Sequence, residues 1–324
     1  MLTLIGRHYQ SGELRRIAVE GERIAAMETP AGDDPDALGG ADCWLAPGLL
    51  DLQVNGFAGR DFNAPDVTPA DVVVVAESLA VAGVTAFCPT VITASHAALV
   101  TSLGVIATAC EISPLARERI LGIHLEGPYL SPEDGPRGAH PLAHVRLPDW
   151  DEFTRLQAAA GGRIRMITLA PELPGALEFI ARARGAGVIV ALGHHQATRA
   201  QLLAAVEAGA RLSTHLGNGC HAVLPRHNNY LWEQLAHDGL WASIIVDGHH
   251  LPSAVVKTIF RTKGAARLIL VSDAVAAAGL PPGRHHAFGA EVEVRADGSV
   301  HLAGTPYLAG SGLRLWQAVP NVMR

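Results

Sequence analysis

Residues 187–215, with the sequence GVIVALGHHQATRAQLLAAVEAGARLSTH, decide the fold class of this chain. The stretch begins with glycine and apolar residues, which predict a buried strand over residues 187–192. Residues 198–209 are rich in Ala and Leu and predict a helix, and residues 210–215 predict a second strand. A strand, a helix and a strand in this order form a βαβ unit, which is typical of a parallel sheet covered by helices.

The same alternation extends over most of the chain. Further helices are predicted between further apolar stretches, at residues 69–82, 150–160, 174–186 and 251–263. Eight strands with right-handed crossovers over roughly 230 residues predict a (β/α)8 TIM barrel, a fold of the α/β class. The six remaining predicted strands are residues 48–54, 83–88, 119–125, 163–169, 241–246 and 266–272.

Both ends of the chain have a β-rich pattern instead. Residues 14–19 and 24–27 predict one hairpin, and residues 290–295 and 299–303 predict another, joined by an Ala-Asp-Gly turn. A helix is expected to begin within residues 311–323.

These patterns predict two domains. We expect residues 47–280 to form the barrel, and residues 1–46 and 281–324 to form one small β domain. The chain ends shortly after the second predicted hairpin, so we expect this small domain to be incomplete at its C-terminal end.

The composition excludes several classes of partner. The chain is 49% hydrophobic and 17% charged, and its net charge of −6 comes without a basic block. Nucleic acid and anionic membranes are therefore not expected partners, because both need clustered Lys and Arg. Four scattered cysteines indicate neither a disulfide framework nor a thiolate metal site. No signal-peptide pattern begins the chain, and we expect a cytoplasmic protein.

Ionisable and polar side chains follow the ends of the predicted strands. Because the carboxyl ends of barrel strands meet at one face, where catalytic groups gather, these side chains should lie together. They are Gln53 and Asn55 after the first strand, Glu126 after the third, His194 and His195 after the fifth, His215 after the sixth, Asp247, His249 and His250 after the seventh, and Asp273 after the eighth.

Four of these residues predict metal-assisted hydrolysis. The imidazoles of His194 and His215 and the carboxylate of Glu126 suit one divalent first-row metal ion, zinc first, with iron or another such metal also suited. A metal of this kind activates water and polarises a carbonyl group. Asp273 would accept the proton from water and later give it to a leaving amine. The sequence therefore predicts hydrolysis of an amide or a related bond.

At these residues the chain resembles the N-acetylglucosamine-6-phosphate deacetylase family of the amidohydrolase superfamily. The matching motifs occur in the order found in that family, and the one that contains Glu126 is the most specific. They are residues 46–56 (APGLLDLQVNG), 122–130 (GIHLEGPYL), 138–141 (GAHP), 192–195 (LGHH), 213–216 (STHL), 247–250 (DGHH) and 271–274 (VSDA).

The resemblance implies roles for individual residues. It implies one metal ion on Glu126, His194 and His215, Asp273 as base and then acid, and deacetylation of N-acetylglucosamine 6-phosphate. His140 matches a histidine that helps to polarise the acetyl carbonyl. Gln53 stands where many amidohydrolases have the first residue of a His-x-His pair, which argues against a second tightly held metal.

The resemblance also implies a substrate pocket. Arg226 and His250 match positions that bind the sugar phosphate, in a pocket completed across a homodimer, and we expect Asn218 and Gln53 to contact the substrate as well. After His215 the family usually has Leu-Phe-Asn-Ala-Met and later Arg-Glu-Pro-Gly, whereas this chain has a divergent loop over residues 216–229. Two alternatives therefore stay open, namely an amidohydrolase for a different N-acyl or cyclic amide and an inactive binding protein.

Overall fold

The computed structural model describes residues 2–32, 34–287 and 290–323. The chain forms two compact units, Met1–Gly48 and Leu49–Arg324. The smaller unit is a four-stranded sheet with the strand order β3-β2-β1-β4. Strands β2 and β3 pair antiparallel, which confirms the first predicted hairpin. The strands are β1 (Leu2–His8), β2 (Leu14–Glu20), β3 (Arg23–Glu28) and β4 (Leu38–Leu45).

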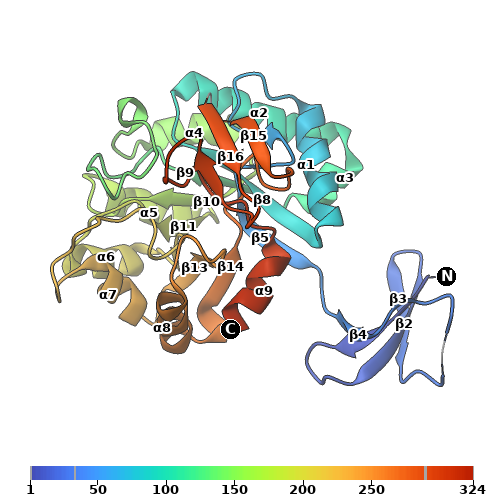
Figure 1. The fold of residues 1–324 in the computed structure, drawn as a ribbon. Coiled ribbons are helices and arrows are strands. Elements are labelled where there is room, and N and C mark those ends of the chain that lie inside the picture. Colours follow the sequence, from blue (N-terminus) through green and yellow to red (C-terminus); the bar gives the residue numbers. More distant parts are fainter. Residues whose placement is uncertain (1, 33, 288–289, 324) are drawn as a thin grey trace. The chain divides into compact units, whose positions relative to one another are not determined.

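The larger unit is built on the eight parallel strands that the sequence predicts (Figure 1). The sheet closes into a barrel because its first and last strands meet, where Asp273 N donates to Gln53 O at 3.0 Å and Asn55 N donates to Ala274 O at 2.8 Å. The third strand begins later than predicted, because a short helix extends to Arg119. The strands are β5 (Leu49–Val54), β8 (Val84–Ile92), β9 (Ile123–Glu126), β10 (Ile164–Leu169), β11 (Ile189–Leu192), β12 (Leu212–Ser213), β13 (Trp241–Ile245) and β14 (Leu268–Val271).

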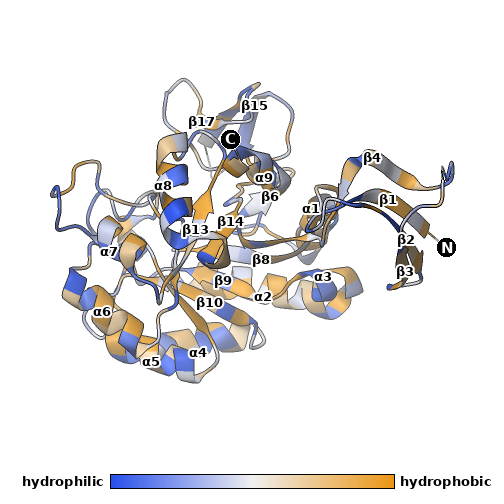
Figure 2. Ribbon diagram, turned by 90° about the horizontal axis from the view of Figure 1, so that it is seen from below, coloured by the Kyte–Doolittle hydropathy of each residue, from blue (hydrophilic) through white to orange (hydrophobic). Residues whose placement is uncertain are grey.

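Helices with mixed hydrophilic and apolar faces surround the apolar strands (Figure 2). Thr68 and Thr198 begin two of these helices with capping boxes, in which each threonine side chain accepts a bond from the backbone of the third helical residue. The five predicted helices are confirmed as α1 (Pro69–Val81), α4 (Trp150–Ala159), α5 (Ala176–Gly185), α6 (Arg199–Ala208) and α8 (Ser253–Lys263). The others are α2 (His96–Ile112), α3 (Pro114–Arg119), α7 (Tyr230–Ala236), α9 (Leu315–Met323), η1 (Leu142–His144) and η2 (Ala265–Arg267).

Two small sheets complete the larger unit. One pairs β6 (Gly56–Phe57) with β7 (Arg60–Asp61). The other consists of β15 (Gly283–Ala287), β16 (Ala290–Val294) and β17 (Val300–Leu302), and the β16–β17 pair confirms the second predicted hairpin. This sheet is separate from the N-terminal sheet, and that both ends of the chain form one small domain stays a prediction.

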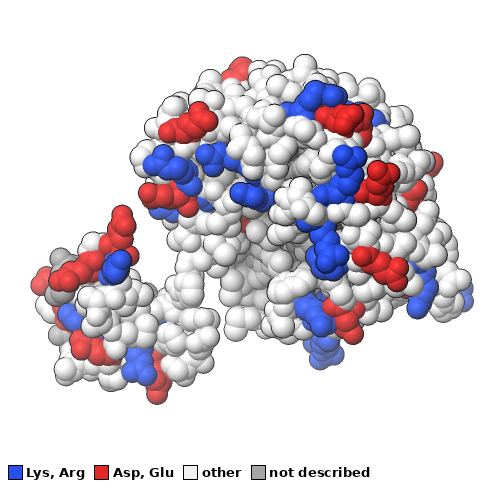
Figure 3. Space-filling view, turned by 180° about the vertical axis from the view of Figure 1, so that it is seen from behind, with Lys and Arg blue, Asp and Glu red and all other residues white. Residues whose placement is uncertain are grey.

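Basic and acidic side chains are interspersed on the surface of the larger unit seen in Figure 3. Within the described ranges, no helix is both long and apolar enough to cross a bilayer.

Candidate metal centre and active site

The side chains of Glu126, His194 and His215 converge at the carboxyl ends of β9, β11 and β12. Glu126 Oε1 lies 3.0 Å from His215 Nε2 and 3.2 Å from His194 Nε2, and the two Nε2 atoms are 3.0 Å apart. Ligand atoms around a tetrahedral zinc ion, at bonds of about 2.0–2.1 Å, are about 3.3 Å apart. The spacing of these three buried groups therefore fits one small divalent ion.

His140 adds a third imidazole to the same point. Glu126, His140 and His194 each offer a ligand atom within 4.8 Å of the others, and His140 Nε2 is 3.3 Å from His194 Nε2. His215 Nε2 contacts both Glu126 Oε1 and His194 Nε2 at 3.0 Å, whereas among the described hydrogen bonds His140 contacts only His194 of these two. The geometry thus brings together one carboxylate and three imidazoles, of which His215 fits the metal position better than His140.

The backbone is strained where the strands deliver these side chains. Among the described residues other than glycine, positive φ occurs at His194 (54°), His215 (28°), Asp273 (49°) and Ala58 (51°). Such a φ costs a residue with a Cβ about 1–3 kcal/mol, and strain of this kind gathers at functional sites. Three of these four residues belong to the predicted site, so packing holds them in an unfavourable conformation that points their side chains to one place.

A hydrogen bond on the far side of its ring orients His194. His194 Nδ1 lies 2.9 Å from the carbonyl oxygen of Pro136, which can only accept, so Nδ1 carries the proton and Nε2 keeps a free lone pair. Burial opposes the ionisation of Glu126, but the adjacent side chains of His194 and His215 outweigh it and lower the pKa of this carboxyl. A charged carboxylate beside a neutral imidazole is the state that a metal requires.

Asp273 lies beside this cluster with a carboxyl suited to proton transfer. Its Oδ1 accepts a bond of 2.7 Å from Asn55 Nδ2. Burial, and then the negative charge of Glu126, raise the pKa of Asp273 to about 6. A group that titrates near neutral pH both accepts and returns a proton efficiently.

Thr93 is a site residue that the sequence reasoning missed. Its Oγ1 lies 2.9 Å from Nδ1 of His140, and burial, followed by the nearby charge of His194, lowers the pKa of His140 to about 3. The sequence predicts that the second strand ends at residue 88, just before Pro89. The observed strand β8 extends to Ile92, which places Thr93 at its carboxyl end. A predicted strand that continues past Pro89 to Ile92 would have placed Thr93 at its carboxyl end.

Gln53 and Asn218 lie next to the predicted metal ligands. Gln53 Nε2 donates to Glu126 Oε1 at 3.0 Å, so this side chain orients the carboxylate that would bind the metal. Asn218 N and Nδ2 both donate to the carbonyl oxygen of His215, at 2.9 and 3.3 Å. Both residues are therefore brought into the site.

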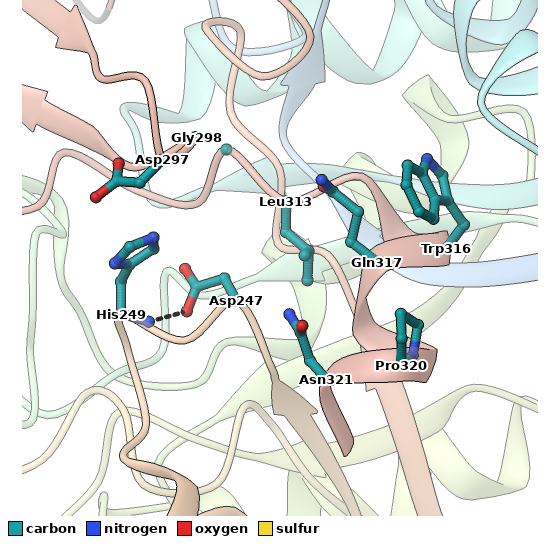
Figure 4. A pocket seen from close by; sticks show the side chains of 10 residues that line it. Asp247, His249, Asp297, Gly298, Leu313, Trp316, Gln317, Pro320 and Asn321 are labelled. Atoms are coloured by element: carbon teal, nitrogen blue, oxygen red, sulfur yellow. Dashed lines mark hydrogen bonds between the residues drawn. The ribbon is translucent and has the colours of Figure 1, made fainter. Parts of the chain in front are cut away.

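His250 lies on the loop after β13, and Asp247 fixes it there. His250 Nδ1 is 2.6 Å from Asp247 Oδ2, and burial of Asp247 is outweighed by this contact, which lowers the pKa of Asp247 to about 2. Asp247 also accepts from the backbone of His249 and lines a pocket of about 290 Å³ that β16–β17 and α9 border (Figure 4). His250 is thus held by Asp247 on this strand-end loop, and its role in binding phosphate stays a prediction.

Arg226 is not brought into this cluster. It is exposed on the loop over residues 216–229 and lines an apolar groove of about 470 Å³ with Trp232 and Val255. Its role therefore stays a prediction.

A (β/α)8 barrel with one carboxylate and two imidazoles at the carboxyl ends of its strands is the arrangement of a metal-dependent hydrolase. No family model matches the chain. It is 33% identical over 304 residues to the N-acetylglucosamine-6-phosphate deacetylase of Bacillus subtilis, covering 92% of this chain and 75% of that one. It is 38% identical to the Bos taurus enzyme of that name, over 90% of this chain and 71% of that one.

A third relative has a different name. The N-acetylgalactosamine-6-phosphate deacetylase of Escherichia coli O157:H7 is 34% identical, over 86% of this chain and 72% of that one. Among solved structures, a mutant N-acetyl-D-glucosamine-6-phosphate deacetylase from Mycobacterium smegmatis, in complex with N-acetyl-D-glucosamine-6-phosphate, superposes with a TM-score of 0.83 and 31% identity, covering 99% of this chain and 82% of that one. The chain belongs to the N-acetylglucosamine-6-phosphate deacetylase family, as its motifs predict.

Proposed function

We propose that this chain hydrolyses the acetamide bond of N-acetylglucosamine 6-phosphate to glucosamine 6-phosphate and acetate. The observation that carries the proposal is the convergence of Glu126 Oε1, His194 Nε2 and His215 Nε2 within 3.2 Å of one another, beside the carboxyl of Asp273. Family membership supports the substrate, because the named relatives act on N-acetylated hexosamine 6-phosphates.

Glu126, His194 and His215 would hold one divalent metal ion per chain. When bound, such an ion lowers the pKa of a water molecule and polarises the acyl carbonyl. Asp273, held by Asn55, accepts the proton of the attacking water and then protonates the leaving amine. His140 donates a hydrogen bond to the acyl oxygen as negative charge develops on it.

Four finer statements are part of the proposal. Zinc is the proposed metal, since nitrogen and carboxylate ligands at tetrahedral spacing suit it. The substrate phosphate would bind His250 and Arg226, with Arg226 acting across a homodimer. Support for the homodimer comes from the apolar groove beside Arg226, where Trp232 is 52% exposed. Four free cysteines agree with a cytoplasmic, reducing location.

The divergent loop over residues 216–229 favours one second candidate, an amidohydrolase for a related N-acyl substrate. Gly217 stands where the family usually has Phe, with its φ at +99°. This loop carries Asn218 and Arg226, and a change there alters the substrate while leaving the metal ligands intact.

The experiment measures acetate release by purified protein of known metal content. The substrates are N-acetylglucosamine 6-phosphate, N-acetylgalactosamine 6-phosphate and unphosphorylated N-acetylglucosamine. Asp273→Asn is the test variant, and Asp238→Asn is its control, because Asp238 has a side chain that is 90% exposed in a surface ion pair. Release that needs both the phosphate and Asp273 would support the proposal. Protein with one metal per chain that releases no acetate from these substrates would refute it and favour the second candidate.

A further inference from the structure

The hydroxyl of Thr93 is the only side-chain group that contacts Nδ1 of His140 among the hydrogen bonds of the described residues. Both side chains are buried, with exposed fractions of 2% and 6%. The distance from Thr93 Oγ1 to His140 Nδ1 is 2.9 Å, whereas the other acceptor within reach of the hydroxyl, the carbonyl oxygen of Glu126, is 3.4 Å away. The contact with His140 is therefore the stronger of the two.

The proposed role of His140 sets the direction of this hydrogen bond. A neutral imidazole carries one ring proton. To donate to the acyl oxygen from Nε2, the ring atom that faces His194 Nε2 at 3.3 Å, His140 has to carry that proton on Nε2. Its Nδ1 is then an acceptor, and Thr93 has to be the donor.

We propose that Thr93 is a positioning residue, which donates to Nδ1 of His140 and so fixes the tautomer that presents an Nε2 proton to the acyl oxygen of the substrate. The inference rests on the proposed function for the role and the tautomer of His140, and on the contact of 2.9 Å for the part of Thr93. It concerns a residue that follows β8, one of the two strands whose carboxyl ends supply no residue to the predicted site.

A partly buried ion pair keeps the two partners in place. Arg146 donates to both carboxylate oxygens of Glu152, at 2.9 and 2.8 Å. The same guanidinium donates to Ala94 O, next to Thr93, and to His144 O, on the loop that carries His140. The side chain of Arg146 thus connects the end of β8, which is followed by Thr93, to the segment that carries His140.

Kinetics of three variants test the proposal. Thr93→Val keeps the shape and removes the hydroxyl, Thr93→Ser keeps the hydroxyl, and Thr85→Val is a control on the exposed part of the same strand. We expect Thr93→Val to lower kcat about tenfold to a hundredfold at unchanged KM and metal content, the usual cost of losing the partner that orients a site histidine. Thr93→Ser should recover most of kcat. Equal kcat in Thr93→Val and the unaltered protein would overturn the proposal.

A second measurement does not depend on activity. Nitrogen chemical shifts of isotope-labelled histidine in the zinc-loaded protein report which ring nitrogen carries the proton, and His140→Gln assigns the signal. We expect protonated Nε2 and unprotonated Nδ1 in the unaltered protein and in Thr93→Ser, and a tautomer mixture in Thr93→Val. Protonated Nδ1 in the unaltered protein would overturn the inference. Because this result is obtained even if no acetate is released, failure of the inference and failure of the proposed function are distinguishable.

Discussion

The backbone of Gly219 packs directly against the ring of His194, and Gly219→Ala is the most direct test of the predicted metal centre. A Cβ at residue 219 would lie 2.7 Å from Nδ1 and 2.8 Å from Cε1 of that ring. The imidazole of His194 has no free space to move into. Its Nδ1 is hydrogen-bonded to Pro136 O, and Gly138 packs close to the same ring. The substitution therefore displaces the imidazole itself.

The size of the effect follows from these distances. Ordinary Cβ contacts begin at 3.4 Å, so the ring has to move by 0.7 Å. Metal–ligand bonds tolerate only about 0.2 Å. We expect metal affinity to fall about tenfold to a hundredfold, which equals about 1.4–2.7 kcal/mol. The positive φ of Gly219, 57°, adds a cost in folding stability of about 1–2 kcal/mol.

Gly187→Ala is the matched control. Gly187 also has a positive φ, 76°, but a Cβ there would meet no atom within 4 Å. Both variants should lose similar stability in urea unfolding of metal-free protein. Only Gly219→Ala should lose zinc affinity, measured by competition with a chromophoric chelator. Equal zinc affinity in the two folded variants would refute the assignment of His194 as a ligand.

Three further predictions concern groups outside the metal cluster. Burial raises the pKa of Asp51 to about 7. The folded state therefore keeps a proton that the unfolded state releases near pH 4, and the free energy of unfolding falls as the pH rises from about 4 to about 7. Asp51→Asn should abolish this slope and gain up to about 4 kcal/mol at pH 8 in urea unfolding, and an unchanged slope would contradict the prediction. Lys263 donates to three backbone carbonyls at 2.6–2.9 Å, and Lys263→Met should cost about 2–4 kcal/mol of stability, whereas Lys257→Met on the exposed face of α8 should cost almost none. Arg226→Ala should raise KM about tenfold to a hundredfold for the phosphorylated sugar alone, and an equal rise for the unphosphorylated sugar would remove Arg226 from the phosphate site.

The convergence of the site could be predicted because topology alone produces it. Once apolar runs predict eight parallel strands, their carboxyl ends must meet at one face, however far apart they lie in sequence. Glu126, His194, His215 and Asp273 follow four different strands, and the structure brings all four together. No side-chain packing needs to be known for this step.

Other elements depended on packing and were missed. Residues 96–112 form α2 although Val100, Gly104 and Thr108 weaken its helix propensity. Burial of Leu99 and Leu103 against the barrel stabilises the helix instead. The positive φ values of the site histidines are likewise imposed by tertiary structure, since nothing in a His-containing motif indicates a left-handed backbone.

Protonation states depend on a further level of structure. Residue types show that His140 and His194 are available, but not which nitrogen of each carries a proton. For His194 that choice is made at the Pro136 carbonyl, which faces Nδ1 only because the loop over residues 127–146 folds back over the site. The loop in turn is held by the bonds of Arg146 to Glu152 and to two carbonyls. The predicted metal ligands thus follow from strand order, whereas the proton position on His194 follows from a loop that lies outside the strands.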